Sequence, residues 1–299
     1  MKQKSPYLTI LTPTYNRGEL LKKCYESLKV QTNKEFQWLI VDDGSTDDTE
    51  RIARDFCEES PQMNIKYLRK ANGGKHTALN YAHSYIEGDY VLILDSDDTL
   101  TKVAVAEAYA GWSNYEDKKE VGIVILLKGV EVDKPNAYVQ DEMVPVDIMN
   151  YPRICVKGRD CCEIIRSELF KMYPFPEFRG EKFISEGALW NRVAMTHKCV
   201  YINKVIYLCE YLEGGLTKSG KSMRIRNPYG GMYTSNLRMH KKNFMKERIK
   251  SGLLYVCYGF FAQLTPIAIV AREKEHRLMK GMCLLPGFCL YVLWKKKYS

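Results

Sequence analysis

Three carboxylates follow directly on an apolar run at residues 90–98, which reads Tyr-Val-Leu-Ile-Leu-Asp-Ser-Asp-Asp. A continuous apolar run of this length predicts a strand that is buried on both faces. In open α/β sheets, ligands bind beyond the carboxyl ends of the strands. If the backbone stays extended, Asp95 and Asp97 point the same way, because side chains alternate along a strand. Such carboxylates suit a hard divalent cation, Mn²⁺ or Mg²⁺, unless they only cap the next helix or stay solvated.

A second polar segment, Thr-Pro-Thr-Tyr-Asn-Arg-Gly at residues 12–18, follows a predicted strand at residues 7–11. The apolar spacing after it predicts a helix, so the order is strand, loop, helix. Pro13, Tyr15 and Arg17 place a carbonyl, an aromatic ring and a guanidinium in this loop. They are candidates for contacts with a base and with phosphates, although the segment can also be an ordinary connection.

The next two predicted strands, at residues 36–41 and 65–68, also end in polar loops. Asp42 and Asp43 stand at the end of the first, where a ligand-facing acceptor is a better interpretation than a helix cap. In the loop after the second, Gly74 allows close approach of backbone to a ligand, and Lys75 is a candidate phosphate contact. The glycine spacing matches neither a Walker loop nor a dinucleotide fingerprint.

Strands and helices alternate from residue 7 to about residue 127, which predicts an α/β fold with a mostly parallel central sheet flanked by helices. The pattern becomes irregular from about residue 128. Glu181 and Glu186 precede a predicted helix there. Either acid is a candidate general base, and either can instead stabilise the first turn of that helix.

The composition of 45% hydrophobic and 27% charged residues over 299 positions is typical of a packed globular protein. A net charge of +9 is compatible with nucleic acid, an anionic membrane or a phosphorylated substrate. The positive charge gathers near the end of the chain and not in an aromatic-rich groove, so no nucleic-acid partner is expected. Ten scattered cysteines and the absence of a signal-peptide pattern predict a cytoplasmic protein without a cysteine metal cluster.

Two apolar segments, at residues 253–271 and 281–294, each contain a proline and lie among Lys and Arg residues. A membrane-spanning helix needs about 20 apolar residues, so the second segment is too short and the first is borderline. We expect helices that lie in a membrane interface, or else a helical subdomain packed on the rest of the chain.

Four segments together resemble the family 2 glycosyltransferases, which are inverting enzymes that use nucleotide sugars. They are Thr-Pro-Thr-Tyr-Asn-Arg at 12–17, Val-Asp-Asp-Gly-Ser at 41–45, the block at 72–80 and Asp-Ser-Asp at 95–97. The resemblance is strong over about the first 130 residues and looser to about residue 227. It implies the A-type glycosyltransferase fold, in which a Rossmann-like nucleotide half is fused to an acceptor half. The apolar segments near the end of the chain add a C-terminal helical extension. In this reading residues 1–227 form the catalytic domain. Residues 1–127 are its nucleotide-sugar-binding half, residues 128–227 its acceptor half, and residues 228–299 a helical, membrane-associating region.

The resemblance also implies roles for the site residues. Pro13 and Tyr15 would surround a uracil, and Asp43 would accept from its ring N–H with Asp42 close by. The other roles concern the metal and the diphosphate: Asp97 binds the metal, Asp95 meets the ribose or a metal-bound water, and Arg17 and Lys75 face the diphosphate.

The implied reaction is a single displacement, in which a base deprotonates an acceptor hydroxyl that attacks the anomeric carbon opposite the nucleotide. Family members usually carry the base as the Asp of a Glu-Asp pair at a helix start. Here the pair reads Glu186-Gly187, so Glu186 is the first candidate for the base and Glu181 the second.

The predicted function is transfer of a sugar from a UDP-sugar to a lipid-linked glycan, such as a polyprenyl diphosphate oligosaccharide, at the inner face of the cell membrane. It would serve surface polysaccharide or cell-envelope glycan synthesis. One alternative is a non-catalytic nucleotide-sugar-binding scaffold subunit. Another is a sugar nucleotidyltransferase, which would need a Gly-rich loop after the first strand, where residues 12–18 hold a single glycine.

Overall fold

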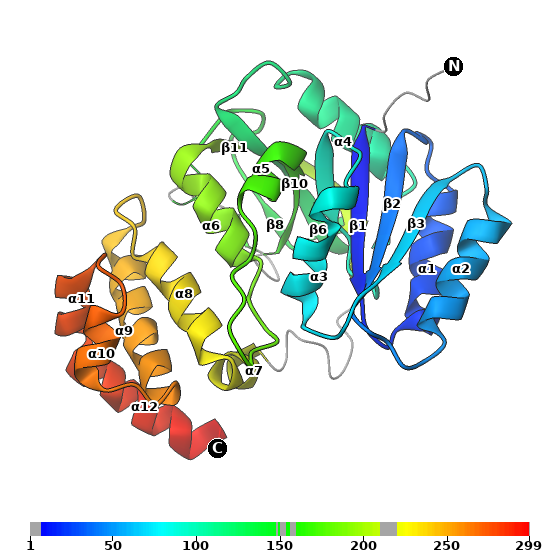
Figure 1. Cartoon of the computed structure of the whole chain (residues 1–299). Coiled ribbons are helices and arrows are strands. Elements are labelled where there is room, and N and C mark those ends of the chain that lie inside the picture. Colours follow the sequence, from blue (N-terminus) through cyan, green and yellow to red (C-terminus); the bar gives the residue numbers. More distant parts are fainter. Residues whose placement is uncertain (1–6, 148, 150–153, 156–159, 210–219, 299) are drawn as a thin grey trace. The chain divides into compact units, whose positions relative to one another are not determined.

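The computed structural model describes residues 7–147, 149, 154–155, 160–209 and 220–298 (Figure 1). Internal contacts divide the chain into two compact units. The first comprises Met1–Pro174 and Thr196–Glu210, and the second comprises Phe175–Met195 and Tyr211–Ser299. The second unit joins part of the predicted acceptor half to the C-terminal helices, so these units do not follow the predicted boundary at residue 227.

A parallel half-sheet forms the beginning of the first unit. Its spatial order is β3-β2-β1-β4, made of β1 (Leu8–Thr14), β2 (Phe36–Asp42), β3 (Asn64–Arg69) and β4 (Tyr90–Ile93). Every residue of β1, β2 and β4 is buried, and for β4 this agrees with the continuous apolar run of its sequence. The chain first moves outward from β1 to β3 and then returns to the other side of β1. The strand order therefore reverses between β1 and β4, where open α/β sheets bind ligands.

Helices cover both faces of this half-sheet (Figure 1). On one face, α1 (Gly18–Lys29), α2 (Thr49–Glu59) and α4 (Ala104–Ser113) share a core with alternate residues of the strands. On the other face, α3 (Lys75–Tyr81) packs beside β1 and β2, followed by the short 3₁₀ helix η1 (Ala82–Tyr85). The helices cover the two faces of the half-sheet, and the loops that follow the carboxyl ends of the strands remain accessible.

The second half of the sheet is mixed, whereas the sequence predicts a mostly parallel sheet. It continues from β4 in the order β10-β6-β11-β5, and β10 (Cys161–Arg166) runs antiparallel to both β4 and β6 (Val121–Glu131). A parallel neighbour needs a crossover that brings the chain back to the same end of the sheet, whereas β10 begins at the opposite end. The remaining strands are β11 (Lys198–Leu208), β5 (Thr99–Leu100), β7 (Lys134–Pro135), β8 (Ala137–Tyr138) and β9 (Ile154–Cys155), and α5 (Ser167–Met172) follows β10.

The second unit is helical and is built around α9 (Met245–Phe261). Buried residues that include Met232, Tyr255, Val256 and Ile269 form its core. The backbone at Gly231 approaches the Tyr258 ring so closely that an added Cβ would lie 2.7 Å from it. The other helices are α6 (Gly187–Thr196), α7 (Gly220–Arg226), α8 (Pro228–Arg238), α10 (Pro266–Ala271), α11 (Arg277–Met282) and α12 (Leu284–Tyr298).

The two apolar segments of the sequence become several short helices. The first contains the end of α9, a turn at Gln263 and α10, and the second contains the end of α11 and most of α12. Within the described residues, no helix combines the length and the apolar character that crossing a membrane requires.

Candidate functional site

The carboxylates after β4 lie at the point where the strand order of the sheet reverses. The strand ends at Ile93, and residues 95–98 form a turn in which the Asp98 N–H donates to the Asp95 carbonyl over 3.1 Å. The premise that extended backbone aligns Asp95 with Asp97 is therefore wrong. A turn gives each acid its own direction, and each meets a different neighbour.

Each of these two acids pairs with a cation from another loop. The Asp97 carboxylate lies 2.5 Å from the Arg17 guanidinium, which comes from the loop after β1. The Asp95 carboxylate accepts from the Lys75 ammonium at the start of α3. Burial opposes the charged form of Asp95, but the nearby cations, Lys75 foremost, outweigh it and hold its pKa below the usual value. The fold thus brings together four residues that sequence reasoning selected from three separate loops.

Two residues that sequence reasoning missed complete this cluster. The Tyr207 hydroxyl, from the end of β11, donates to the Asp98 carboxylate over 2.7 Å and accepts from the Asp95 N–H over 3.0 Å. Lys128, in β6, has its ammonium 3.9 Å from the centre of the Tyr207 ring, and its charge also lowers the Asp95 pKa. Burial raises the pKa of Asp98 to about 6, against the opposing effect of the Tyr207 hydrogen bond. The only sequence signal for Lys128 is that it is the first charged residue after the apolar run of its strand.

The two acids at the end of β2, Asp42 and Asp43, are both buried and hold the neighbouring loops. The Asp42 carboxylate accepts from the backbone N–H and the hydroxyl of Ser45 and from the Tyr67 hydroxyl, over 2.6–2.8 Å. The Asp43 carboxylate accepts from the Lys70 ammonium and from the loop after β3. A carboxylate has roughly four lone-pair positions, so the ring N–H of a nucleobase could bind Asp43 only by replacing one of its present donors. These donors are Lys70 Nζ at 2.8 Å, Asn72 Nδ2 at 3.1 Å, Gly73 N at 2.9 Å and Gly74 N at 2.6 Å.

The glycine loop before α3 owes its conformation to this contact. Gly74 has a φ of +97°, which residues with a side chain rarely adopt, and its N–H points to Asp43. The Thr77 hydroxyl donates to the Gly74 carbonyl over 2.9 Å and fixes the first turn of the helix. The N–H groups of this loop therefore serve Asp43, and the Lys75 side chain is the group of the loop that reaches the carboxylates after β4.

The loop after β1 presents one aromatic ring to solvent. Pro13 is buried within β1 opposite Val41, whereas Tyr15 is 46% exposed. Asn16 takes a left-handed conformation with a φ of 52°, and its side-chain oxygen accepts from the Thr46 N–H over 2.7 Å. This ties the loops after β1 and β2 together next to the exposed Tyr15 ring.

The two candidate bases belong to the second unit and differ in their surroundings. Glu181 is buried, and its two carboxylate oxygens accept from the N–H groups of Tyr229 and Gly230, over 2.7 and 2.8 Å, at the start of α8. Burial nevertheless raises its pKa. Glu186 precedes α6, is partly exposed and uses its backbone carbonyl to accept from Leu189 and Trp190. This geometry gives Glu181 a helix-capping role, whereas the Glu186 side chain is partly exposed at the start of α6.

The chemistry of the site residues fits a divalent cation that keeps other ligands. Carboxylates are the preferred protein ligands of Mg²⁺ and Mn²⁺, which usually retain water and phosphate oxygens. Asp97 and Asp95 would hold such an ion, in exchange for Arg17 and Lys75. Among the residues that the structure describes, no group of three or more His, Cys, Asp and Glu surrounds a common point, so phosphate or water would complete the coordination.

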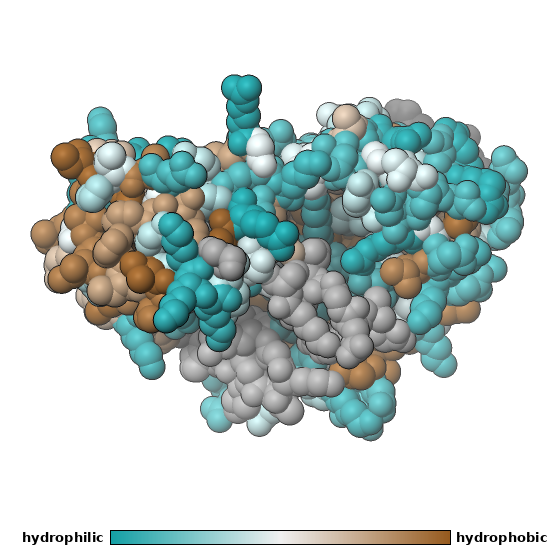
Figure 2. Space-filling model, turned by 90° about the horizontal axis from the view of Figure 1, so that it is seen from below, coloured by the Kyte–Doolittle hydropathy of each residue, from teal (hydrophilic) through white to brown (hydrophobic). Residues whose placement is uncertain are grey.

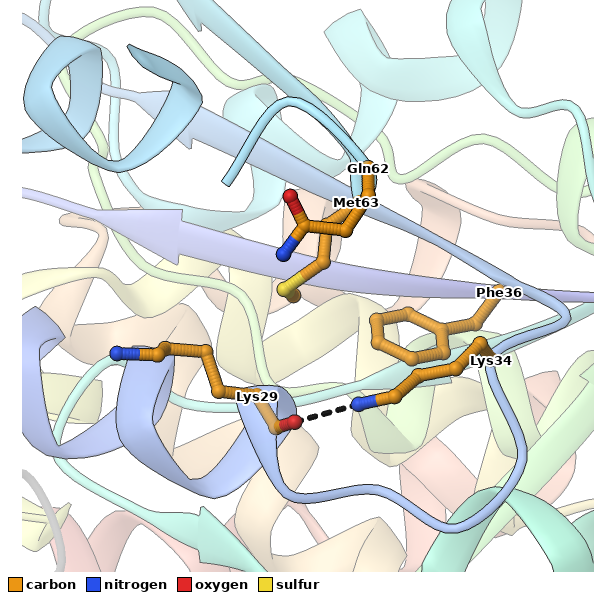
Figure 3. Close-up of a pocket in the computed structure, with 5 residues that line it drawn as sticks. All are labelled: Lys29, Lys34, Phe36, Gln62 and Met63. Atoms are coloured by element: carbon orange, nitrogen blue, oxygen red, sulfur yellow. Dashed lines mark hydrogen bonds between the residues drawn. The ribbon is translucent and has the colours of Figure 1, made fainter. Parts of the chain in front are cut away.

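Two cavities of the first unit lie at the opposite end of the sheet from these acids. One, of about 140 Å³, is lined by Lys29, Lys34, Phe36, Gln62 and Met63, at the amino end of β2 (Figure 3). In it the Lys34 ammonium donates to the Lys29 carbonyl. The other, of about 720 Å³, includes Tyr7, Gly88 and Tyr90 near the amino ends of β1 and β4. Neither cavity belongs to the cluster of acids and cations.

Comparison with known proteins agrees with this arrangement. Residues 9–143 match the sequence profile of Glycosyl transferase family 2. The chain is 24% identical over 233 residues to glycosyltransferase GlyG of Streptococcus pneumoniae serotype 4, across 72% of this chain and 74% of GlyG. S. aureus TarS in complex with UDP-GlcNAc has a TM-score of 0.59 and 19% identity, covering 96% of this chain and 81% of that chain. Mannosyltransferase PcManGT from Pyrobaculum calidifontis, in complex with GDP-Man and Mn²⁺, has a TM-score of 0.58 and 17% identity, covering 98% and 89%.

The predicted α/β fold class is therefore confirmed, with the sheet mixed and the C-terminal helices present. The order of motifs along the sequence, the reversal point of the sheet and the family profile all concern the same stretch of chain. Residues 9–143 belong to glycosyl transferase family 2.

Proposed function

We propose that this protein is a metal-dependent inverting glycosyltransferase that moves a sugar from a nucleotide diphosphate donor, a UDP-sugar, to a hydroxyl of a glycan acceptor. The observation that carries the proposal is the pairing of Arg17 with Asp97 and of Lys75 with Asp95, at the reversal point of a family 2 sheet. The nucleotide sugars in the TarS and PcManGT complexes support a donor of this class.

Donor binding is an exchange of ion pairs in this proposal. The Asp97 carboxylate would hold a divalent cation, with Asp95 beside it or on the ribose, and the bound cation would neutralise charge on the departing diphosphate. Arg17 and Lys75, released from the two carboxylates, turn to the diphosphate oxygens. Each charged group thus exchanges one partner of opposite sign for another.

The uracil of the donor is held by other residues of the nucleotide-sugar-binding half. The exposed Tyr15 ring stacks on the uracil, with Pro13 behind it in β1. Asp43 accepts from the ring N–H after one of its loop donors moves away, and Asp42 stays on Ser45 and Tyr67 to keep the loop in place. Before the uracil binds, the positive φ of Gly74 allows the loop after β3 to place its N–H groups on Asp43.

Transfer requires a base for the acceptor hydroxyl, and we assign this role to Glu186. The Glu186 carboxylate takes the hydroxyl proton as the oxygen attacks the anomeric carbon from the face opposite the diphosphate. Glu181 remains the second candidate for the base, and its use would require that α8 lose its cap.

We also propose that the acceptor is lipid-linked, such as a polyprenyl diphosphate glycan, and that the enzyme works at the inner face of the cell membrane in cell-envelope glycan synthesis. The apolar and basic C-terminal helices support this part of the proposal.

The test is a thermal-shift panel of nucleotide diphosphates and their sugars, with and without Mn²⁺. A ligand that binds only the folded state raises the melting temperature with the logarithm of its concentration over its Kd. We expect a Mn²⁺-dependent shift with UDP or a UDP-sugar. No shift with any nucleotide contradicts the donor assignment.

A second candidate function, a nucleotide-sugar-binding scaffold without turnover, is favoured by one observation: Gly187 stands where the family carries its Asp. Slow metal-dependent hydrolysis of the bound UDP-sugar separates the two, because an enzyme activates the donor bond and a scaffold does not. Donor binding without any hydrolysis or transfer supports the scaffold.

A further inference from the structure

The outer face of α11 and α12 is an apolar surface that the protein leaves uncovered. Leu278 is 81% exposed, Met282 73% and Leu285 75%, and the stripe continues through Cys289 and Val292. These positions are four and three residues apart in turn, so within each helix they share one face. Figure 2 shows hydrophobic residues gathered on the surface of the C-terminal helices. Other exposed apolar side chains of this region are Ile267, Phe288 and Leu293.

The inner face of α12 is also apolar and packs on α9. Gly287 lies so close to Val256 that an added Cβ would be 2.7 Å away, and the Phe260 and Phe288 rings meet with centres 5.0 Å apart. A helix that is apolar all round is covered on all sides, by protein or by lipid. Since α9 covers only one side of α12, its outer side requires a second covering.

Charge decides which covering fits this surface. Lys295, Lys296 and Lys297 are exposed at the end of α12, and the sequence holds no acidic residue between Arg277 and Tyr298. A second copy of this chain with the two stripes running the same way would bring Lys295–Lys297 against the same three lysines. An anionic lipid surface offers hydrocarbon to the stripe and phosphate groups to the lysines.

We propose that the outer face of α11 and α12 inserts into the interface of an anionic lipid bilayer, with Lys295–Lys297 among the headgroup phosphates. The aromatic side chains next to the lysines fit this placement: the Lys295 ammonium lies 5.6 Å from the centre of the Tyr291 ring, and Trp294 lies one position before it. We propose insertion into one leaflet only, and none of the described helices is long and apolar enough to span the bilayer. This inference deepens and rests on the proposed function, since it names the surface that would bring the enzyme to a lipid-linked acceptor.

The experiment measures flotation of the full-length protein with phosphatidylglycerol–phosphatidylcholine vesicles and with phosphatidylcholine vesicles, without donor or acceptor. We expect flotation with the anionic vesicles alone. The double variant Leu285→Gln/Leu293→Gln should reduce it at least tenfold. Lys295→Gln/Lys296→Gln/Lys297→Gln should do the same and remove its salt dependence. Val30→Gln/Val132→Gln is the matched control, because these residues of the first unit are exposed to a similar degree and should leave flotation unchanged.

A second readout uses the position of Cys289. It is the only exposed cysteine among those whose side chains the structure describes, so a polarity-sensitive dye attached there reports on the stripe. We expect a blue shift of its emission with anionic vesicles, and this shift should be lost in Cys289→Ser. Unchanged emission and equal flotation of all variants overturn the proposal. So does a dimer in lipid-free solution that Leu285→Gln/Leu293→Gln dissociates, since a second copy would then cover the stripe. The Mn²⁺-dependent shift with UDP is measured on the same variants, so loss of lipid binding and loss of donor binding are told apart.

Discussion

Replacement of Tyr207 by phenylalanine removes one hydroxyl that joins two backbone segments 109 positions apart. That oxygen donates to the buried Asp98 carboxylate and accepts from the Asp95 N–H. An unsatisfied buried polar group costs about 1–3 kcal/mol, and Asp95 is partly accessible to water, which replaces part of the loss. We therefore expect Tyr207→Phe to lower the free energy of unfolding by about 2–3 kcal/mol.

The same change should loosen the turn that presents Asp97 and Asp95. Residues that orient a metal ligand without touching the metal typically affect affinity by about 10–100-fold, so we expect at least about a tenfold loss of Mn²⁺-dependent UDP affinity. Denaturant unfolding measures the first effect. Titration calorimetry at a temperature where both proteins are folded measures the second.

Tyr255→Phe is the matched control, because Tyr255 is also fully buried and its hydroxyl has no hydrogen-bond partner among the described residues. It should leave both stability and UDP binding near those of the wild type. If Tyr207→Phe behaves like this control in both assays, the idea that its hydroxyl holds the turn is refuted. If only stability falls, Tyr207 supports the fold and does not position the site.

Three further substitutions address the metal, the base and the cap. Asp97→Ala should weaken Mn²⁺-dependent UDP binding by more than the roughly 10–100-fold expected for an indirect contact. An affinity equal to that of the wild type would exclude Asp97 as the metal ligand. Glu186→Gln should keep donor affinity and reduce transfer about 10²–10⁴-fold, and surviving transfer would move the role to Glu181 or to the substrate. Glu181→Ala should lower the free energy of unfolding by about 1–2 kcal/mol, because α8 loses its cap, with the donor affinity of the first unit unchanged. Unchanged denaturant unfolding would show that water replaces this cap.

Strands β1, β2 and β4 were predictable because each is buried along its length and is followed by polar residues. Residues 36–41, for example, differ from β2 by a single residue at one end. What the pattern cannot give is direction: the apolar run of β10 is the same whether its neighbours are parallel or antiparallel. The sequence therefore could not predict that the second half of the sheet is mixed.

The site shows the same division between local and distant causes. Asp95, Asp97, Arg17 and Lys75 were selected from their own loops, since polar residues at strand ends are a local signal. The turn at residues 95–98 was not, because it depends on Tyr207, far along the chain. Likewise, the contact of Glu181 with α8 joins positions 48 and 49 residues apart, which no short pattern reveals. The metal and the base themselves remain predictions.

The paired charges at the reversal point also bear on selectivity. With Arg17 on Asp97 and Lys75 on Asp95, these four groups carry no net charge. A free phosphate that approaches Arg17 must compete with a carboxylate, and a free divalent cation that approaches Asp97 must compete with a guanidinium. Only a ligand that brings both signs at once, such as a metal–diphosphate complex, gives every group a new partner. The resting site would thus discriminate against the abundant inorganic ions of a cell before the sugar or the base is recognised.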